Sequence, residues 1–468
     1  MNFTRTKIIC TIGPATQDIG SLRRLHKSGM NVARINMSHA THKSAKAVID
    51  KIHKINNDSK FNYGKIGILL DTQGPEIRTG DTELTMDLKV GDEVTLTVRD
   101  QVDVETSSIK INYKDLIKSV SEGSKISVDN GLINFKVLSK DEETLLCKVL
   151  DGGKLGSKRH VNLPGVRVNL PSITSKDLDD IEFGVKNNVD FIALSFVRDS
   201  EDLEKLQKIL DSKKSKAKII AKIENQEGLD NIHQISKASW GVMVARGDLG
   251  IETSLTDLPN IQRRIMHACA KWGRRSIVAT HLLESMIENP TPTRAEVTDI
   301  ANAIYEGADA IMLSGETSVG KYPIDCVKFL KSIALKTEKF KTLEYEKSFS
   351  PNSDWQHIGL AAKNLAESIK ADGIIAITRT GKTAQYISNS KPNGIPIFTF
   401  TGNKKTLSQL TLVGSTVSFY LANLSNHEKT LENVYKIWGR PVHIQTTDDN
   451  TPMFWSFNGE EHERTLLV

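Results

Sequence analysis

The sequence has few cysteines, and none lies close to another. The four cysteines are Cys10, Cys147, Cys269 and Cys326, and they form no CxxC pair. The patterns of a disulfide-rich domain and of a thiolate zinc site are therefore both missing. We expect the four thiols to be reduced and buried in the core.

Long apolar runs and a strong charge imbalance are missing as well. No apolar run approaches the roughly 18 residues of a membrane span, and Arg5 and Lys7 stand where a signal peptide would need its apolar stretch. Lys and Arg number 62 against 57 Asp and Glu, and a net charge of +5 over 468 residues is too dilute for a nucleic-acid surface. We predict a cytoplasmic protein that binds neither membrane nor nucleic acid, and small anionic substrates remain possible.

The overall composition is that of a folded, soluble protein. Hydrophobic residues make up 38% and charged residues 25% of the chain, which excludes a disordered or fibrous protein. A chain of 468 residues exceeds one ordinary core, so we predict two or three domains.

Short apolar runs alternate with amphipathic segments of helical length over the first 340 or so residues, which is the pattern of βα units. Eight such runs predict eight parallel strands that close into a barrel, which is an α/β fold of the (β/α)8 TIM-barrel type. Each run turns polar at its end, and in a barrel those ends meet at the rim that carries the chemistry. The runs are KIICTIG, NVARINMS, KIGILLDT, DFIALSFVR, KIIAKIEN, GVMVARGD, SIVATHLLES and AIMLSGET. Their polar ends hold Arg34, Asn36, Ser38, Asp71, Thr72, Arg198, Lys222, Glu224, Arg246, Asp248, Thr280, Ser314 and Glu316.

The third βα unit is interrupted. Between Arg78 and about Pro171, short alternating runs separated by Gly, Asp and Ser predict a small antiparallel β domain that can act as a lid. Thr174 and Asp177 then form a capping-box start for the next helix. After residue 345, helix-like and strand-like segments alternate again, which predicts a separate C-terminal α/β domain.

Three residues on neighbouring strands carry a possible metal site. Lys222 and Glu224 lie two residues apart on one strand and so share a face, and Asp248 follows the neighbouring strand. Two carboxylates with room for substrate suit Mg²⁺ or Mn²⁺, and Lys222 would add the positive charge that a phosphoryl group in transfer requires. A plain Lys–Glu ion pair at the barrel mouth is the alternative.

Other polar residues allow more than one interpretation. Arg34 either grips a phosphate or forms a rim ion pair. The oxygens of Asn36, Ser38, Asp71 and Thr72 suit a monovalent cation or ordinary structural hydrogen bonds. The segment TRTGKT is no Walker A motif, because Ala376 stands where its first glycine is required, but it can form an anion-binding turn before a helix.

The order of longer motifs resembles one known family. TIGPAT, NVARINMSH, DTQGPEIRTG, LGSK, VNLPG, AKIENQEGLDN, MVARGDLG, LLESMI, PTRAE, IANAI and IMLSGET look like successive signatures of pyruvate kinases, from residue 6 to about 330. The resemblance implies a barrel domain at 1–78 and 171–345, an inserted β-barrel at 79–170 and an α/β effector-type domain at 346–468. It also implies a homotetramer.

The resemblance further implies phosphoryl transfer from phosphoenolpyruvate to ADP, which gives pyruvate and ATP. In that family pattern Glu224 and Asp248 hold Mg²⁺ or Mn²⁺, and Lys222 and Arg34 bind the phosphoryl group. The amides of Ala245, Gly247 and Asp248, with Thr280, receive the substrate carboxylate. The remaining matches are Thr280, Ser314 and Glu316 for the proton path; Asn36, Ser38, Asp71 and the carbonyl of Thr72 for K⁺; Pro14, His39, Arg78 and Lys158 for the nucleotide; Asp129 of the lid; and Thr378, Arg379, Thr380, Gly381, Lys382 and Thr383 for a sugar-phosphate effector.

The chain departs from the family pattern at several places. Gln73 stands where many relatives have Lys, His281 where Gln is common, and Arg159 with His160 where KG is typical. Trp240 replaces an acidic residue, and the tail lacks the usual Gly-rich closing loop.

Two other functions compete with this interpretation. One is a Mg²⁺-dependent lyase or aldolase that stabilises a pyruvate enolate on a TIM barrel, and the other is an inactive binding protein of the same fold. The combination of Lys222 with the insert at 79–170 argues against the lyase, and the complete set of catalytic residues argues against the inactive protein.

Overall fold

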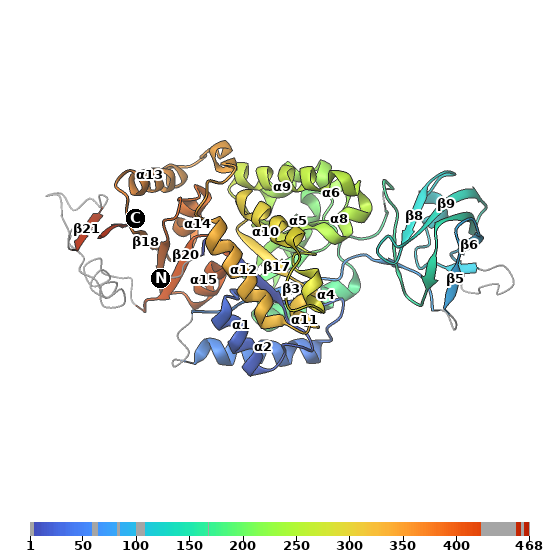
Figure 1. Ribbon diagram of the computed structural model, residues 1–468, viewed down its shortest axis with the longest axis horizontal. Coiled ribbons are helices and arrows are strands. Elements are labelled where there is room, and N and C mark those ends of the chain that lie inside the picture. Colours follow the sequence, from blue (N-terminus) through green and yellow to red (C-terminus); the bar gives the residue numbers. More distant parts are fainter. Residues whose placement is uncertain are drawn as a thin grey trace.

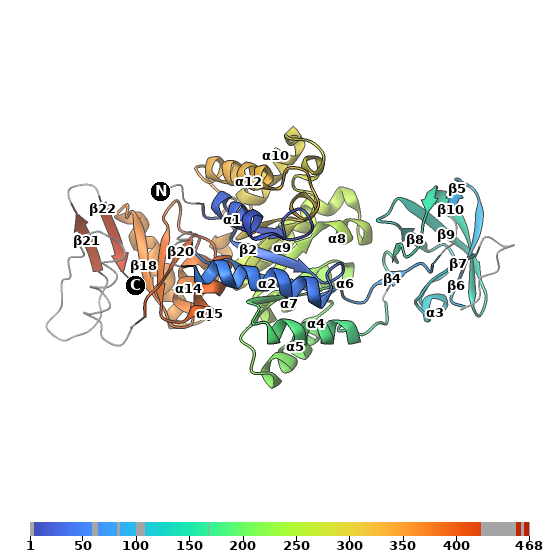
Figure 2. The same ribbon diagram turned by 90° about the horizontal axis from the view of Figure 1, so that it is seen from below.

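The computed structural model describes residues 4–58, 64–81, 85–99, 108–166 and 168–422, and the strands at 455–459 and 463–467. Three parts lie in a row, with a barrel in the middle, an inserted β domain at one end and a C-terminal α/β part at the other (Figures 1 and 2). This arrangement confirms the predicted fold class. The domain boundaries at residues 78, 170 and 345 stay predictions.

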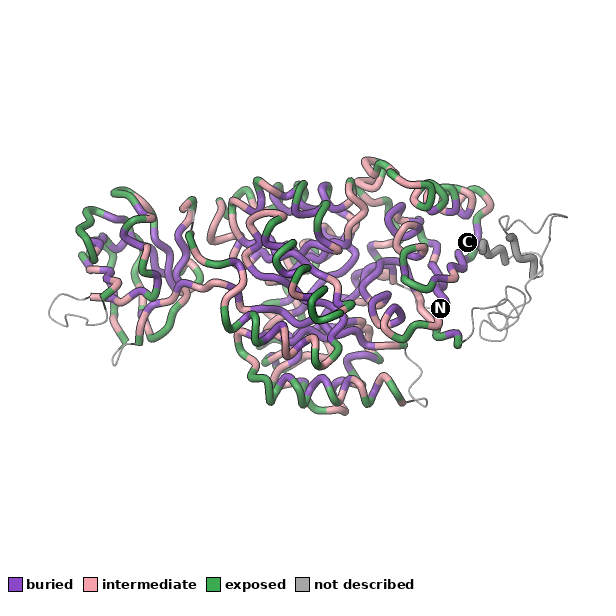
Figure 3. Tube along the Cα trace, turned by 180° about the vertical axis from the view of Figure 1, so that it is seen from behind, coloured by how far each residue is buried: buried purple, intermediate pink, exposed green. Residues whose placement is uncertain are grey.

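Eight parallel strands form the barrel, and they coincide with the eight predicted runs. Every residue in them is buried except Asn36 and Lys218, because one face fills the barrel and the other packs against helices (Figure 3). The strands are β1 (Lys7–Thr11), β2 (Val32–Asn36), β3 (Gly67–Asp71), β13 (Phe191–Leu194), β14 (Lys218–Ile223), β15 (Gly241–Ala245), β16 (Arg275–Ala279) and β17 (Ala310–Leu313). They close in the order β1, β17, β16, β15, β14, β13, β3, β2.

Helices surround the barrel, and several begin at capping side chains. The Asp18 carboxylate accepts the Ser21 amide at 2.9 Å. Thr174 and Asp177 form the predicted capping box, and Asp177 also accepts the amide of Gly74 at 3.0 Å. The helices are α1 (Ile19–Ser28), α2 (His42–Asn57), α4 (Ser175–Lys186), α5 (Ser200–Ser212), α6 (Gln226–Asp230), α7 (Ile232–Ala238), α8 (Arg246–Glu252), α9 (Leu258–Trp272), α10 (Arg294–Tyr305), α11 (Gly315–Ser318) and α12 (Pro323–Thr337).

The insert has a sheet and a core of its own. Its seven-stranded sheet runs in the order β4 (Ile77–Arg78), β12 (His160–Asn162), β8 (Lys125–Val128), β9 (Ile133–Lys140), β10 (Thr144–Asp151), β6 (Glu93–Thr97), β7 (Ser108–Lys110). A bridge between Thr79 and Ile111 joins the two ends of this sheet. The predicted antiparallel pairing is wrong for β6 and β7, which are parallel. An antiparallel pair of β5 (Met86–Leu88) and β11 (Gly153–Leu155) and the short helix α3 (Leu116–Ser119) complete the insert.

The C-terminal part is an α/β sheet packed on the floor of the barrel, where the barrel strands begin. Lys405 Nζ lies 2.8 Å from Asp190 Oδ1, and Lys7 Nζ donates to the carbonyl of Thr416 at 2.6 Å. The sheet order is β20 (Thr416–Tyr420), β19 (Ile397–Thr401), β18 (Gly373–Ile377), β22 (Glu463–Leu467), β21 (Trp455–Gly459), with helices α13 (Asp354–Ser368), α14 (Lys382–Asn389) and α15 (Lys404–Gln409).

The structure gives the state of the four cysteines and the character of the described helices. All four cysteines are buried free thiols, as predicted. Within the described ranges, no helix combines the length and apolar character that a bilayer crossing needs.

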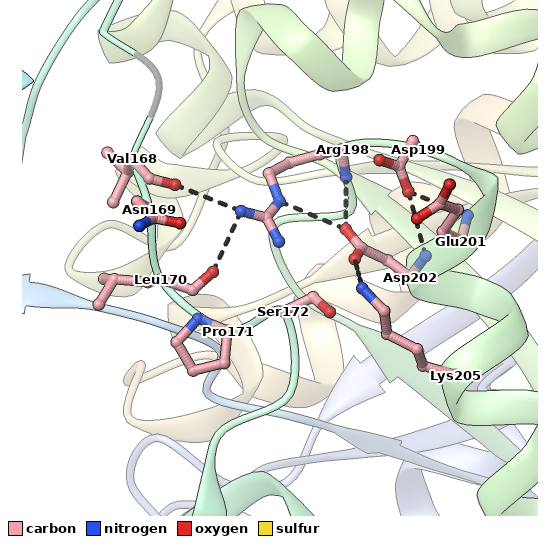
Figure 4. Close-up of a pocket in the computed structure, with 10 residues that line it drawn as sticks. All are labelled: Val168, Asn169, Leu170, Pro171, Ser172, Arg198, Asp199, Glu201, Asp202 and Lys205. Carbon is pink, nitrogen blue, oxygen red and sulfur yellow. Dashed lines mark hydrogen bonds and ion pairs between the residues drawn. The ribbon is translucent and has the colours of Figure 1, made fainter.

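Arg198 ties the insert to the barrel. Arg198 follows β13. Its Nη1 donates to the carbonyls of Val168 at 3.3 Å and Leu170 at 3.1 Å, which lie in the segment where the chain returns from the insert to the barrel (Figure 4). Its Nε lies 3.4 Å from the buried Asp202, which also pairs with Lys205 at 3.2 Å. Burial raises the pKa of Asp202, but hydrogen bonds from Ser172 and Arg198 outweigh it and hold the pKa below its usual value. A cavity of about 540 Å³ lies against this tether.

These contacts of Arg198 predict that it protects the segment at residues 163–171 from proteolysis. The substitution Arg198→Met keeps most of the side-chain stem but removes the Nη1 group, and with it both hydrogen bonds to the carbonyls of Val168 and Leu170. We expect limited proteolysis at residues 163–171 to become about tenfold faster, which is the effect of losing about one net hydrogen bond to a charged group. Lys205→Met is the matched control, because it also removes a cation from Asp202. Equal cleavage rates in the two variants would contradict the role of Arg198.

Candidate active site

Four charged side chains form a buried row of ion pairs at the rim. Arg34 lies in β2, Asp71 ends β3, Lys222 lies in β14 and Glu224 follows it. Arg34 Nη2 lies 2.6 Å from Asp71 Oδ2, while Lys222 Nζ lies 3.1 Å from Asp71 Oδ1 and 3.0 Å from Glu224 Oε1. The prediction that Lys222 and Glu224 share a face is confirmed, and in this structure they form the ion pair that was the alternative.

Residues after β13 complete this row. Lys222 Nζ donates to Ser195 Oγ at 2.8 Å, and Ser195 Oγ donates to the carbonyl of Thr72 at 2.7 Å. The amide of Phe196 donates to Glu224 Oε2 at 2.6 Å, and Phe196 has a left-handed φ of 52°. This strained backbone points an amide at the carboxylate, so Glu224 is held by a lysine on one oxygen and an amide on the other.

The charges of the site are unevenly compensated. Burial raises the pKa of Glu224 to about 7 against the opposing charge of Lys222, and burial likewise raises the pKa of Asp248. Burial lowers the pKa of Lys222, but Asp71 and Glu224 outweigh it and leave the pKa above its ordinary value. The ammonium therefore stays charged, while the two carboxylates are costly to ionise without a further cation. This hard-oxygen pair fits a divalent ion such as Mg²⁺ or Mn²⁺.

Asp248 lies in the first turn of α8, directly after β15. His160 of the insert lies 3.8 Å from it, between Nδ1 and Oδ1, and its ring is tilted against Phe196 with centroids 6.3 Å apart. At the other end of α8, Asn162 Nδ2 donates to Glu252 Oε1 at 2.9 Å. The insert therefore contacts both ends of the helix that carries Asp248. Of the described residues, no group of three or more His, Cys, Asp or Glu is arranged to hold a metal, so the protein offers two carboxylates here.

The loop after β16 is strained and held by an arginine. Thr280 has φ of 73° and His281 φ of 55°, and a left-handed conformation is unusual for a β-branched residue. Arg246 Nε donates to the carbonyls of Ala279 and Thr280, both at 3.1 Å, and its Nη1 contacts both oxygens of Asp299 at 2.7 and 2.8 Å. A Cβ on Gly247 would lie 3.2 Å from Thr280 Cγ2, so a glycine permits this close approach. Thr280 and the start of α8 thus lie side by side. Their binding of a carboxylate, which the family resemblance implies, stays a prediction.

Glu316 is engaged with the backbone of the same rim. Its Oε1 accepts the Leu283 amide at 3.0 Å and its Oε2 accepts the Ser314 amide at 2.7 Å. The side chain is fully buried, and burial raises its pKa. Glu316 therefore fixes the loop after β16 against the end of β17.

The residues predicted for a monovalent cation lie on neighbouring strands but already have partners. Asn36 and Asp71 are paired across β2 and β3. Asn36 Oδ1 accepts the Ser38 amide at 3.2 Å, and Asp71 is shared by Arg34 and Lys222. The Thr72 carbonyl accepts the Ser195 hydroxyl.

The residues predicted for a nucleotide are only partly brought together. Arg78 donates to the Lys158 carbonyl at 2.8 Å and pairs with Glu76 at 2.6 Å. Gln73 Nε2 donates to the same Glu76 oxygen at 2.9 Å. Pro14 and His39 lie in the loops after β1 and β2, at the same rim. Asp129 in the insert has Arg159 Nη1 3.4 Å from its Oδ1.

The predicted effector segment lies far from this rim. Residues 378–381 join β18 to α14, and Lys382 and Thr383 are the first two residues of α14, in the C-terminal part that packs on the barrel floor. Gly381 adopts φ of 82°, and its amide donates to Thr378 Oγ1 at 2.9 Å. Thr406 Oγ1 donates to the carbonyl of Arg379 at 3.0 Å. The predicted order of strand, turn and helix is present.

Three residues of the site, Ser195, Phe196 and Asp299, were not among the predicted ones. Ser195 is the first polar residue after the apolar start of the run DFIALSFVR, so the pattern of polar strand ends contained a signal for it. Nothing local marks Phe196 or Asp299, because their roles depend on a left-handed amide and on a helix from a different βα unit.

Comparisons with known proteins agree with this geometry. Residues 3–327 match the family described as "Pyruvate kinase, barrel domain", and residues 356–449 match "Pyruvate kinase, alpha/beta domain". Plastidial pyruvate kinase 2 of Arabidopsis thaliana is 41% identical over 440 residues, covering 92% of this chain and 74% of the relative. A pyruvate kinase of Staphylococcus epidermidis is 43% identical over 418 residues, covering 87% and 70%.

A solved structure is similar over nearly the whole chain. The crystal structure of a pyruvate kinase from Cryptosporidium parvum aligns with a TM-score of 0.88 at 35% identity, and the alignment covers 93% of this chain and 90% of that one. Both the sequence relatives and the barrel rim with its buried Lys222 and Glu224 lead to one assignment. The chain belongs to the pyruvate kinase family.

Proposed function

We propose that the rim transfers the phosphoryl group of phosphoenolpyruvate to ADP and then protonates the enolate to pyruvate. The observation that carries this proposal is the ammonium of Lys222, held 3.0 Å from Glu224 and 3.1 Å from Asp71 in a buried site. A fixed positive charge in a water-poor site stabilises the charge of a transferring phosphoryl group. Arg34, anchored on the same Asp71, supplies a second positive charge.

Glu224 and Asp248 are the residues that would hold Mg²⁺ or Mn²⁺. When bound, such an ion supplies Lewis-acid stabilisation of substrate oxygens. The two carboxylates suit this role because desolvation raises the pKa of each, and a divalent cation would supply the missing charge compensation. Glu224 is buried, whereas the side chain of Asp248 is 34% exposed, so an ion bound there could also reach substrate. The Phe196 amide fixes one oxygen of Glu224, so its orientation does not depend on the ion.

The amides of Ala245, Gly247 and Asp248, with the Thr280 hydroxyl, would bind the substrate carboxylate. Arg246 positions Thr280 by donating to its carbonyl, and Arg246 is itself fixed by its ion pair with Asp299. Thr280, Ser314 and Glu316 would carry the proton toward the enolate, and the buried Glu316 keeps that loop in place.

Several finer roles belong to the same proposal. Asn36, Ser38, Asp71 and Thr72 would bind K⁺, and Pro14, His39, Arg78 and Lys158 would face the nucleotide. Residues 378–383 would bind a sugar-phosphate effector, with a monophosphate favoured over a bisphosphate because the closing Gly-rich loop is missing from the sequence. We propose a cytoplasmic homotetramer. A Mg²⁺-dependent lyase or aldolase is not favoured, because the relatives are pyruvate kinases.

The role of Lys222 predicts a split between two reactions. Lys222→Met should lower pyruvate formation from phosphoenolpyruvate and ADP by about a thousandfold, the scale of removing one preorganised charge. Proton exchange at the methyl carbon of bound pyruvate should change much less, because the ammonium acts on the phosphoryl group. Lys218→Met, at the other end of β14, is the matched control. A comparable loss in proton exchange would exclude the proposed role.

The carboxylates predict a different pattern. Glu224→Gln and Asp248→Asn should impair both phosphoryl transfer and pyruvate proton exchange, and should raise the Mg²⁺ concentration for half-maximal activity by more than tenfold, because each removes one negative charge from the ion's ligands. Glu252→Gln, which changes a carboxylate on the same helix as Asp248, should shift that concentration by less than twofold. If Asp248→Asn behaves like Glu252→Gln, Asp248 does not bind the metal.

The cation set predicts dependence on K⁺. Glu76 pairs with Arg78 and accepts a hydrogen bond from Gln73. By the family resemblance, relatives that work without the ion have a lysine at the position of Glu76, so the charge of that lysine is not supplied here. We expect KCl to stimulate initial rates several-fold at fixed ionic strength, measured against a tetramethylammonium background. Full activity without K⁺ and Na⁺ would rule out a monovalent-cation requirement.

A further inference from the structure

A second cavity lies where the insert meets the barrel, and we call it the junction cavity. Its volume is about 300 Å³, at the lower end of the range of sites that bind small molecules. The insert strands β4 and β12 and the segment at residues 165–170 form one side, and the loop after β13 with α6 and the end of α8 forms the other. The insert meets the barrel near β4 (Figure 2). Both parts of the chain therefore line one space.

The insert side of the junction cavity is mainly apolar. Ile77 of β4 and Val161 of β12 are 4% and 2% exposed, and Val166 and Val168 are partly buried against the same core. The ring of Phe196 lines the cavity from the barrel. These walls favour a ligand with an apolar body, because its burial removes apolar surface from water.

Carboxylates dominate the charged part of the lining. Glu252 ends α8, and Glu227 and Asp230 belong to α6, whereas Arg198 is the one guanidinium among the described residues that line the cavity. Arg198 already donates to two linker carbonyls and pairs with Asp202. The three carboxylates against one guanidinium leave a formal excess of two negative charges, which favours a cationic ligand.

Glu252 is the carboxylate that joins the buried part of the lining. Its Oε1 accepts Asn162 Nδ2 at 2.9 Å, and Asn162 is 3% exposed. Burial raises the pKa of Glu252 against the opposing hydrogen bond from Asn162. His160, which also lines the cavity, adds little positive charge, because burial lowers its pKa. A cationic group beside Glu252 would supply compensation that the described residues of the lining do not.

The junction cavity is separate from the site at the rim. None of the residues proposed to hold the metal, the substrate, K⁺ or the nucleotide lines it among the described parts of the chain. It is nevertheless adjacent to that site, because the amide of Phe196 donates to Glu224 and Asn225 follows Glu224 in the chain. A ligand here would contact neighbours of Glu224 and not Glu224 itself.

We propose that the junction cavity binds a small organic amine, in which an apolar body carries one ammonium group. The body would lie against Ile77, Val161 and Val166, and the ammonium would lie beside Glu252. Such a ligand would contact the insert and the barrel together and hold them in this arrangement. Binding at the junction cavity does not rest on the reaction proposed for the rim.

Three probes of similar size and different charge test the proposal. Ligand-observed NMR titrations of the full chain near neutral pH would use 2-phenylethylamine, the neutral 2-phenylethanol and the anionic 3-phenylpropionate, all at the same ionic strength. We expect the amine to bind with a Kd of about 1 mM, which is ordinary for a ligand of this size. The alcohol should bind about tenfold more weakly and the anion more weakly still.

One variant tests the charge of the cavity. Glu252→Gln keeps an acceptor for Asn162 but removes the carboxylate charge, so it should weaken binding of the amine by about tenfold and that of the alcohol by less than twofold. Glu201→Gln is the matched control, because Glu201 lines the neighbouring 540 Å³ cavity and is not among the residues of this one. It should bind all three probes as the parent protein does.

A second variant tests the space. Val166→Trp fills the cavity and should weaken binding of the amine and the alcohol by more than tenfold, whereas Val90→Trp places the same ring on a 73% exposed position of the insert and should change neither. Thermal unfolding checks that each variant is folded. Equal Kd values for the amine and the anion, or an amine that binds Glu252→Gln or a folded Val166→Trp as tightly as the parent protein, would overturn the proposal.

Discussion

The arrangement at the rim depends on one buried ammonium between two carboxylates. Lys222 lies within 3.1 Å of both Asp71 and Glu224, and Asp71 in turn holds Arg34. Removing Asp71 would leave the buried Arg34 without its carboxylate partner, which is strongly destabilising. The row of charges therefore has to form as a unit, and the strands β2, β3 and β14 must stand in their observed register for it to do so.

The barrel meets that requirement through its regular strand geometry. Side chains two apart on β14 face the same way, and the parallel strands end at the same rim. Loops then add what strands cannot supply. The left-handed Phe196 turns an amide to Glu224, and the left-handed Thr280 brings its carbonyl to Arg246. Both strained positions lie beside the residues proposed to bind metal and substrate, where backbone strain is most often retained.

Most of the barrel could be predicted from the sequence, because the patterns that indicate its strands are local. The eight apolar runs with polar ends predicted the eight strands, and the spacing of Lys222 and Glu224 predicted their shared face. The parallel pairing of β6 with β7 could not be predicted from alternation, since alternation has the same period in both kinds of sheet. The approach of His160 to Asp248 and of Arg246 to Asp299 depends on how separate units pack.

The reaction proposed for this rim is transfer of a phosphoryl group to a nucleotide. The most direct measurement follows pyruvate and ATP together in a reaction of the purified chain with phosphoenolpyruvate, ADP, Mg²⁺ and K⁺. We expect both products to appear in equal amounts, and neither to form when ADP or Mg²⁺ is left out. Pyruvate released without ADP, or no turnover at all, would contradict it.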